Sequence, residues 1–356
     1  MTMIEDSVGA GVYAARIART LNSGFTALML SVGHRTGLFD VMAALPPATS
    51  ADIARTSGLS ERYVREWLAA MTAAHIVDHD ARTMTYFLPI EYAAVLTRGA
   101  SSANLAPFAQ LLGILGGLED LVVTAFRSGG GIPAEAYERV QEVLAGEKRL
   151  LIDDEYVDAL LDLIPDLHLR LAAGGTILDA GCGDGTLAVA LARRFPRAIV
   201  RGYDVSSPMI ARARERADEA GVHNIRFELY DLSRFEERDA YDLVIALDAI
   251  HELAFPRLVL RRLAASLRRD GAFVMQELAA SSQLAKNDEL PHAPMLYALS
   301  TLQTVPAALA EDGEPLGRIW GRERATYMLG EAGFARLRFA RLACDTRSDY
   351  WIACVR

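Results

Sequence analysis

From Thr176 onwards, short apolar segments suited to β-strands alternate with segments of helical periodicity. Strands are predicted over residues 176–178, 198–203, 225–229, 242–247, 272–275, 335–342 and 350–355, and helices over 187–194, 208–220 and 256–267. This alternation predicts an α/β fold whose doubly wound, mainly parallel sheet carries helices on both faces. Such a sheet directs its ligand to the carboxyl ends of the strands.

A glycine-rich loop follows the first predicted strand and reads Asp-Ala-Gly-Cys-Gly-Asp-Gly over residues 179–185. Alternate glycines let a ligand approach the backbone closely, and the helix that follows directs free N–H groups at an anion. The loop departs from the dinucleotide fingerprint, because the third glycine of that pattern would fall at Thr186. An NAD-dependent dehydrogenase is therefore the least favoured function for this chain.

Acidic residues stand at the ends of four successive strands, namely Asp179, Asp204, Asp231 and Asp248. Asp204 lies 21 residues after Gly183, where a carboxylate can accept hydrogen bonds from both hydroxyls of a ribose. Any one of these residues alone could equally cap a helix. Four of them in order, together with the glycine loop, predict a ligand site at this edge of the sheet.

The loop and the strand-end residues resemble those of class I methyltransferases that depend on S-adenosylmethionine (SAM). The resemblance implies a C-terminal Rossmann-like domain with a seven-stranded sheet and SAM as cofactor. It also implies a cofactor-binding set: Asp179, Gly181 and Gly183 in the loop, Asp204 and Val205 at the ribose, Asp231 and Leu232 at the adenine, and Leu247 and Asp248 at the methionine end.

Before residue 175 the apolar spacing is mostly helical. Helices over 38–45 and 61–72, followed by a two-stranded wing over 76–88 around Asp80, have the order of a winged helix. That unit suits either DNA binding or a dimerisation or lid role. Across residues 50–82, four arginines stand against five acidic residues, which leaves a net charge of −1 and disfavours a DNA-recognition helix. The whole chain has a net charge of −9, which also disfavours nucleic acid and anionic membranes as partners.

A winged helix that precedes a SAM-binding fold is similar to the plant-type small-molecule O-methyltransferases, which dimerise through the N-terminal domain. A group of actinobacterial methyltransferase-like proteins resembles the chain in residues 21–24, 31–40, 126–133, 297–301 and 320–321. The resemblance implies a homodimer with a small-molecule acceptor. It implies three parts: a winged-helix dimerisation domain over 1–100, a helical linker and lid over 101–174, and the SAM-binding domain over 175–356.

His251 follows the fourth strand, at the place where plant-type O-methyltransferases carry a catalytic histidine. The resemblance implies that His251 is the general base for an oxygen acceptor, although a purely structural histidine fits the position as well and a nitrogen acceptor stays open. Glu252 is a candidate to orient the imidazole. Because adjacent residues on a helix point apart, a partner from elsewhere in the chain is expected equally.

Three further residues are candidates for the substrate side or for a lid. Glu277 ends the fifth strand and is expected to make a substrate or structural contact. Tyr137 follows a glycine-rich loop over 129–133, and its ring could cover the sulfonium of the cofactor or simply pack on a helix. Tyr297 lies in a segment shared with the actinobacterial group. In that group a polar stretch follows this segment, where the present chain reads Leu-Gln-Thr-Val-Pro over 302–306, so a different substrate or reaction is expected.

The remaining expectations concern partners, metals and location. The three cysteines, Cys182, Cys344 and Cys354, are too scattered for a disulfide framework or a zinc cluster, so no metal is predicted. Glu5 and Asp6 precede any apolar run, so no signal peptide is expected, and the protein is predicted to be cytoplasmic. In the N-terminal segment, Arg35 is expected to pair with Asp40 or to reach the pocket. The alternative functions are a SAM-using enzyme for cyclisation, decarboxylation or hydroxylation, and a SAM-responsive DNA-binding regulator.

Overall fold

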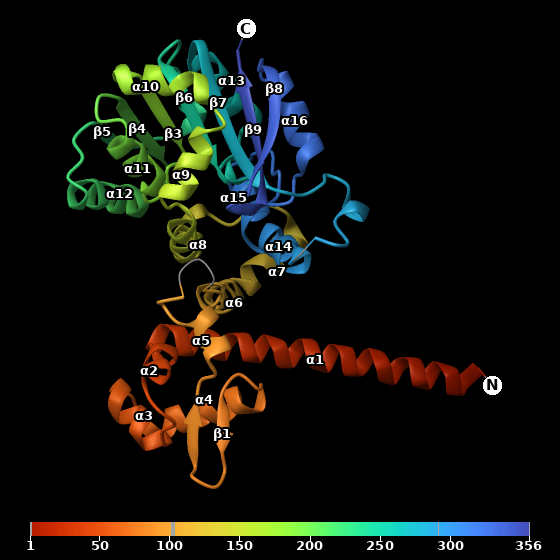
Figure 1. Ribbon diagram of the computed structural model, residues 1–356. Helices are drawn as coiled ribbons and strands as arrows, with labels where there is room; N and C mark the ends of the chain where they lie inside the picture. Colours follow the sequence, from red (N-terminus) through yellow and green to blue (C-terminus); the bar gives the residue numbers. More distant parts are fainter. Residues whose placement is uncertain (1, 101–103, 291, 356) are drawn as a thin grey trace. The chain divides into compact units, whose positions relative to one another are not determined.

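The computed structural model describes residues 2–100, 104–290 and 292–355. The chain divides into two compact units, Met1–Gly117 and Leu118–Arg356 (Figure 1). This division places residues 104–117 in the N-terminal unit and residues 118–174 in the same unit as the large sheet. The dimerisation, linker and lid roles assigned to the three sequence segments stay predictions.

The N-terminal unit has the element order of a winged helix. It contains α1 (Thr2–Thr36), α2 (Leu38–Ala44), α3 (Ser50–Ser57), α4 (Glu61–Ala73), β1 (Asp78–Asp80), β2 (Thr85–Phe87), α5 (Ile90–Leu96), η2 (Ala106–Phe108) and α6 (Ala109–Gly116). The two strands pair antiparallel as the wing, and its turn lies over 81–84 rather than around Asp80, the last residue of β1. The core of the unit includes Phe39 and Trp67, whose rings meet edge to face at 5.3 Å.

The expected ion pair between Arg35 and Asp40 is wrong. Arg35 is exposed, and Asp40 instead accepts a hydrogen bond from Nη1 of Arg98 at 2.6 Å and one from the Arg98 backbone N–H at 2.7 Å. Arg98 also donates to the carbonyl oxygen of His34 at 2.7 Å. The pairing therefore links α1 and α2 to the segment after α5, which sequence spacing alone does not reveal.

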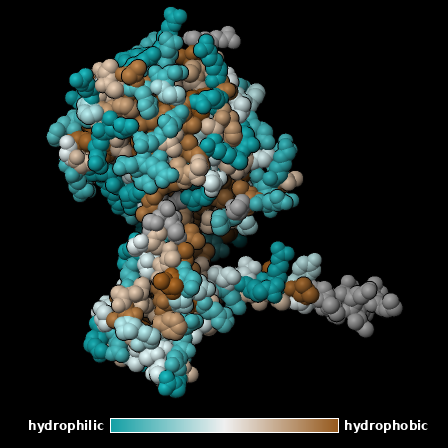
Figure 2. All heavy atoms as spheres, viewed as in Figure 1, coloured by the Kyte–Doolittle hydropathy of each residue, from teal (hydrophilic) through white to brown (hydrophobic). Residues whose placement is uncertain are grey.

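Helix α1 carries a row of exposed apolar side chains. Tyr13, Ile17, Leu21 and Phe25 follow one another at intervals of four residues, so they share one face of the helix, and each is at least 59% exposed. Figure 2 shows apolar spheres along the described part of this helix among polar ones. Isolated apolar residues are common on surfaces, whereas a continuous row of them is characteristic of an interaction face.

The C-terminal unit is built on a seven-stranded sheet in the order β5-β4-β3-β6-β7-β9-β8. Its strands are β3 (Thr176–Ala180), β4 (Ile199–Asp204), β5 (Ile225–Leu229), β6 (Tyr241–Leu247), β7 (Leu267–Leu278), β8 (Ala335–Leu342) and β9 (Asp345–Cys354). The first five pair in parallel, and β9 runs antiparallel to both β7 and β8. The predicted α/β class, the winged helix and the seven-stranded sheet are confirmed.

Helices cover both faces of this sheet (Figure 1). The unit contains α7 (Glu119–Ser128), η3 (Ala134–Tyr137), α8 (Glu138–Leu151), α9 (Asp154–Leu161), η4 (Pro165–Leu167), α10 (His168–Gly174), α11 (Thr186–Arg194), α12 (Ser207–Glu219), η5 (Leu232–Arg234), η6 (Ile250–Glu252), α13 (Pro256–Ser266), η7 (Leu284–Lys286), α14 (Ala293–Leu299), the π-helix η8 (Ser300–Thr304), α15 (Val305–Ala310) and α16 (Arg322–Glu331). Alternate strand residues enter two cores: Ile177 and Leu243 pack with α9, α11 and α12, whereas Leu178 and Val244 pack with α13 and α16.

Two strands, β7 and β9, extend more than two residues beyond their predicted bounds. Strand β7 begins at Leu267 rather than at residue 272. Leu267 pairs with Tyr241, and a bulge then takes up the polar residues 268–271. The other, β9, begins at Asp345 rather than at residue 350. Its polar start is tolerated because the buried Asp349 accepts hydrogen bonds from Arg322 and Arg341.

Segment 281–290 is loop except for η7, and residue 291 lies outside the described residues. Within the described ranges, no single helix has the length and apolar composition needed to cross a membrane. The pair Ala106–Gly116 and Glu119–Ser128 satisfies that test only when both helices are taken together.

Candidate active site

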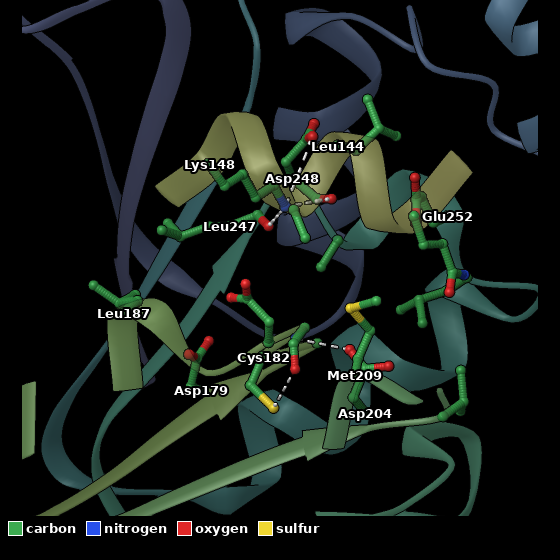
Figure 3. A pocket seen from close by; sticks show the side chains of 18 of the residues that line it. Leu144, Lys148, Asp179, Cys182, Leu187, Asp204, Met209, Leu247, Asp248 and Glu252 are labelled. Atoms are coloured by element: carbon green, nitrogen blue, oxygen red, sulfur yellow. Dashed lines mark hydrogen bonds and ion pairs between the residues drawn. The ribbon is translucent and has the colours of Figure 1, made fainter. Parts of the chain in front are cut away.

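The candidate site lies where the strand order of the sheet reverses. The chain leaves β3 for β4 and β5 on one side and returns to β6 on the other, so the loops after β3 and β6 diverge. A cavity of about 210 Å³ opens there, at the carboxyl ends of β3, β4 and β6. Figure 3 shows the side chains that enter it from the sheet, from α8 and from the loop after β6. This is the position at which open α/β sheets bind their ligands.

The glycine loop after β3 forms one wall of the cavity. Gly181 has a φ of +79°, and a Cβ there would lie 2.7 Å from the Cβ of Ala249. Its backbone N–H and that of Cys182 donate to the carbonyl oxygen of Tyr203, which fixes the loop against β4. At Gly183, with a φ of +53°, no atom of the described chain lies within 4 Å of the position that a Cβ would take. Gly181 therefore has no room for a side chain, and Gly183 leaves free space on the ligand side of the loop.

Two carboxylates stand on the same side of the cavity, the buried Asp179 and the half-buried Asp204. Asp204, at the end of β4, accepts hydrogen bonds from the N–H of Gly183 at 2.9 Å and from that of Ser206 at 2.8 Å. Burial raises the pKa of Asp204 above its usual value. Burial also raises the pKa of Asp179 to about 7, although the positive charge of Lys148 lowers it in part. Acids that are costly to ionise in the free protein suit a ligand that brings a positive charge.

Helix α8 covers the cavity and is held there by polar contacts. Lys148 donates from Nζ to the carbonyl oxygen of Leu247 at 2.9 Å, and the same nitrogen lies 3.8 Å from Oδ2 of Asp248 (Figure 3). The neighbouring Arg149 pairs with Asp184 of the glycine loop at 2.5 Å. Sequence reasoning missed Lys148, because nothing in its local pattern distinguishes it from other basic residues on an amphipathic helix.

His251 lies in η6, next to the cavity-lining residues Ala249 and Glu252, and is fully buried. Its Nδ1 is 2.7 Å from Oε2 of Glu277. Glu277 also accepts hydrogen bonds from the N–H groups of Ile250 and His251, and from the indole N–H of Trp320 at 3.2 Å. The carboxylate that contacts the imidazole is therefore Glu277 from β7. Oε1 of Glu252 lies 3.8 Å from Nε2 of His251, beyond hydrogen-bond range.

The protonation of His251 reflects opposing effects. Burial lowers its pKa, but the negative charges of Glu277 and Asp248 outweigh burial and raise the pKa above its usual value. Because Glu277 accepts the proton on Nδ1, the nitrogen available for chemistry is Nε2. Nε2 is buried and has no hydrogen-bond partner in the described part of the chain.

Arg318 is a second residue that sequence reasoning missed. It is 6% exposed, and its Nη2 donates to Oε1 of Glu252 at 3.0 Å. Its Nη1 lies 3.6 Å from Oδ2 of Asp248. Gln303, from the π-helix η8, lines the cavity and lies between Arg318 and Glu252. A π-helix is rare and often marks a functional site, but its presence is not readable from the sequence.

The structure brings most of the predicted site residues to the cavity; four do not line it, of which His251 and Glu277 contact each other beside it, whereas Asp231 and Tyr297 lie apart. The cavity is lined by Asp179, Gly181, Gly183, Asp204, Val205, Leu232, Leu247, Asp248, Glu252 and Tyr137. Asp231 is not among the lining residues; it is exposed and caps η5 by accepting from the N–H of Ser233 at 2.8 Å. Tyr297 lies off the cavity and accepts a hydrogen bond from Nδ2 of Asn287 at 3.0 Å. Their cofactor and substrate roles stay predictions.

Asp248, His251 and Glu277 also place ligand atoms within 4.8 Å of one another, a spacing that a metal ion can use. Each oxygen of Glu277 already accepts two hydrogen bonds from the chain. The hydrogen bonds of the protein account for this cluster as an imidazole–carboxylate pair. The expectation that the protein needs no metal stays a prediction.

The sheet order, the glycine loop and the cavity at the strand-order reversal define a Rossmann-like methyltransferase fold preceded by a winged helix. Residues 171–333 match the family described as a methyltransferase domain, and residues 24–98 match the family described as an Rv2258c-like winged HTH domain. The chain thus combines a winged HTH domain with a methyltransferase domain.

Known proteins resemble the chain in part or in full. The trans-aconitate 2-methyltransferase of Variovorax paradoxus is 33% identical over 166 residues, which are 46% of this chain and 56% of that protein. The structure of human N-acetylserotonin methyltransferase with SAM has a TM-score of 0.67 at 18% identity and covers 96% of this chain and 97% of that one. An O-methyltransferase family protein of Burkholderia thailandensis has a TM-score of 0.69 at 15% identity and covers 96% and 98%. The structural similarity establishes the shared fold, and the chain spans just over half of its curated relative.

Proposed function

We propose that the protein is a SAM-dependent methyltransferase that methylates an oxygen of a small molecule. The observation that carries this proposal is the pair of His251 and Glu277 beside the cavity, with Nε2 buried and free of hydrogen bonds in the described residues. A nitrogen acceptor needs no base once its lone pair is free, whereas a hydroxyl acceptor must lose a proton, and an imidazole placed in this way can take it. O-methyltransferases among the structural relatives support the same choice.

The residues of the cavity fit SAM. The glycine loop at Gly181 and Gly183 admits a ligand that lies against the backbone. Asp204 would hold the ribose, and Asp179 would face the cationic part of the molecule. When bound, SAM supplies an electrophilic methyl group on a sulfonium. His251 accepts the proton of the acceptor at Nε2, while Glu277 keeps the other ring proton on Nδ1 and fixes the direction of the ring.

Calorimetric titration of the purified protein with SAM, with NAD as the control ligand, tests the cofactor. We expect SAM to bind and NAD to give no heat. Incubation with SAM and a panel of phenols, alcohols and amines then tests the reaction. Methyl transfer yields S-adenosylhomocysteine, whereas intramolecular alkylation releases methylthioadenosine. An absence of SAM binding, or methylthioadenosine as the product, contradicts the proposal.

Asp204→Ala is expected to weaken SAM binding by about 1–3 kcal/mol, because the polar groups that face this carboxylate lose their partner. The Gly183 N–H, which donates to Asp204 in the structure, also loses its acceptor. Calorimetry measures the change. Asp218→Ala, at an exposed position of α12, is the matched control and should bind SAM as the parent does. Equal affinities in the two variants would contradict the ribose role of Asp204.

SAM affinity should also rise with pH. The pKa of Asp179 is about 7 in the free protein, so below pH 7 this acid is mostly protonated, and a cationic ligand must displace that proton to gain the charge of the carboxylate. We expect the dissociation constant to fall as pH increases through 7 and to level off above it. Calorimetry in buffers of different ionisation heat should show proton release on binding. Asp179→Asn, or methylthioadenosine as a ligand without the charged groups of SAM, should remove the pH dependence.

We also propose that the protein forms a homodimer through its N-terminal unit, supported by the exposed apolar row on α1. Static light scattering of the purified chain measures the assembled mass.

A DNA-binding role gains no support from α4, where Arg62 and Arg65 are paired with Glu66 and Glu61. The cytoplasmic location stays a prediction.

A further inference from the structure

Two carboxylates face the two ring nitrogens of His251. Glu277 accepts the hydrogen bond of Nδ1 at 2.7 Å, whereas Oε1 of Glu252 lies 3.8 Å from Nε2. A hydrogen bond of this type is about 2.8 Å long, so Glu252 needs to move only about 1 Å to form one. In the neutral ring Nε2 carries no proton and makes no hydrogen bond to Glu252, but once Nε2 is protonated a carboxylate this close could bind its N–H and hold the proton there.

Arg318 restrains Glu252 against this movement. Its Nη2 donates to Oε1 of Glu252 at 3.0 Å, the same oxygen that faces Nε2. Nε2 of Gln303 lies 3.5 Å from that oxygen, and Oε1 of Gln303 lies 3.4 Å from Nη2 of Arg318. The guanidinium is almost completely buried and therefore depends on these partners for its own stability.

The loop that carries Arg318 has little freedom to move. The Arg318 N–H donates to Oγ of Ser300 at 2.6 Å. Gly321, with a φ of +79°, packs so closely against the backbone that a Cβ would lie 2.0 Å from the nitrogen of Ser282. The same loop carries Trp320, whose indole N–H donates to Glu277. One rigid loop therefore positions both carboxylates that face His251.

We propose that Arg318 is a positioning residue that withholds Glu252 from Nε2 of His251 and so keeps that nitrogen able to accept the proton of the methyl acceptor. The proposal rests on the proposed role of His251 as the base. In the reaction, the O–H bond of the acceptor breaks and its proton goes to Nε2. The oxygen uses the freed electron pair to bond to the methyl carbon, and the methyl–sulfur bond of SAM breaks with its electron pair left on sulfur, which releases S-adenosylhomocysteine. The proton on Nδ1 stays with Glu277 throughout.

Without Arg318, Glu252 is free to bind an Nε2–H. His251 would then be an imidazolium between two carboxylates, a state that holds both of its protons and cannot serve as a base. The other charged group that faces the ring is Asp248, whose Oδ1 lies 3.6 Å from Nδ1. Asp248 is itself balanced by Lys148, Arg318 and Arg347. Glu252 is thus the carboxylate whose position depends on Arg318 and whose oxygen faces the reactive nitrogen.

A double-mutant cycle between Arg318→Met and Glu252→Gln tests the proposal. NMR titration of histidine-labelled protein, assigned with a His251→Asn variant, reports the protonation of His251 without any ligand. We expect His251 in Arg318→Met to stay protonated to higher pH, and kcat/KM at pH 7 to fall about tenfold and recover in alkaline buffer. Glu252→Gln should restore most of the loss when it is added to Arg318→Met, and its own effect in the parent is measured as the third corner of the cycle.

Non-additivity is the decisive result. If Arg318 acted only through its own charge, the effects of the two substitutions would simply add, and additive effects overturn the proposal. An unchanged His251 titration in Arg318→Met overturns it as well. Arg261→Met, at an exposed position of α13, is the matched control for loss of one arginine. Arg318→Gln takes the place of the methionine variant in the same cycle if that variant does not fold.

The NMR arm separates this inference from the proposed function. It needs neither SAM nor an acceptor, so a coupled cycle supports the positioning role even if the reaction is not methyl transfer. Methyl transfer with an additive cycle would leave the proposed function intact and remove only the role of Arg318.

Discussion

His251→Ala should lower the turnover of methyl transfer ~10²–10⁴-fold, the usual contribution of a positioned general base. The dissociation constant of SAM should stay unchanged, because the residues proposed to hold the cofactor, among them Asp179 and Asp204, are left in place. His251 is buried next to the cavity-lining Glu252 and contacts Glu277. Single-turnover kinetics with saturating SAM, alongside calorimetry, separates the two quantities.

His223→Ala is the control for this variant, since His223 is exposed and lies in the turn before β5. Full activity in His251→Ala would show that the acceptor needs no base. That result is expected of an amine or of an acceptor that is already ionised, such as a carboxylate. Loss of SAM binding in His251→Ala would instead mean that the histidine supports the loop after β6 rather than the proton transfer.

The central strands β3 and β6 could be predicted from the sequence because their residues are mostly apolar on both faces, whereas the edge strands β5 and β8 combine apolar with charged residues. Five of the seven lie within two residues of their predicted bounds at each end, and β5 and β8 match at both. The exceptions, β7 and β9, extend through polar residues. Asp349 is an example: its burial is tolerated only because Arg322 and Arg341 reach it from α16 and β8, and such long-range pairing leaves no local signal.

The cofactor side of the site could be predicted because its functional residues lie in short, local segments. The glycine loop and the strand-end residues Asp179, Asp204 and Asp248 are short segments tied to single strands, and all of them line one cavity. The acid–base side of the site could not be predicted, because its residues come together from distant segments. The partner of His251, Glu277, is 26 residues away on β7. Trp320, which contacts Glu277, and Arg318, which contacts Glu252, come from the loop between α15 and α16. Lys148 comes from a helix that precedes the sheet altogether.

Glu277→Gln should lower turnover about as much as His251→Ala does, and raising the pH should not restore the activity. The carboxamide can still accept from the N–H groups of Ile250 and His251 through its oxygen, but its NH₂ group then faces Nδ1 of His251 and the indole N–H of Trp320. A donor at that position favours the tautomer with a bare Nδ1 and a proton on Nε2. That tautomer cannot take a proton at Nε2, which is the atom proposed to do so.

The pH dependence distinguishes this loss from that of Arg318→Met. The charge of Glu277 raises the pKa of His251, so its removal lowers that pKa and shifts the ascending limb of the kcat/KM profile to lower pH, at a much reduced plateau. Arg318→Met shifts the same limb to higher pH, and the activity of that variant recovers in alkaline buffer.

Thermal unfolding checks that the glutamine variant is folded, because removal of one partner from a buried pair is often destabilising. If Glu277→Gln regained full activity at any pH, Glu277 would act through its charge alone and the tautomer argument would be wrong. The nitrogen chemical shifts of His251 then report directly which ring nitrogen carries the proton.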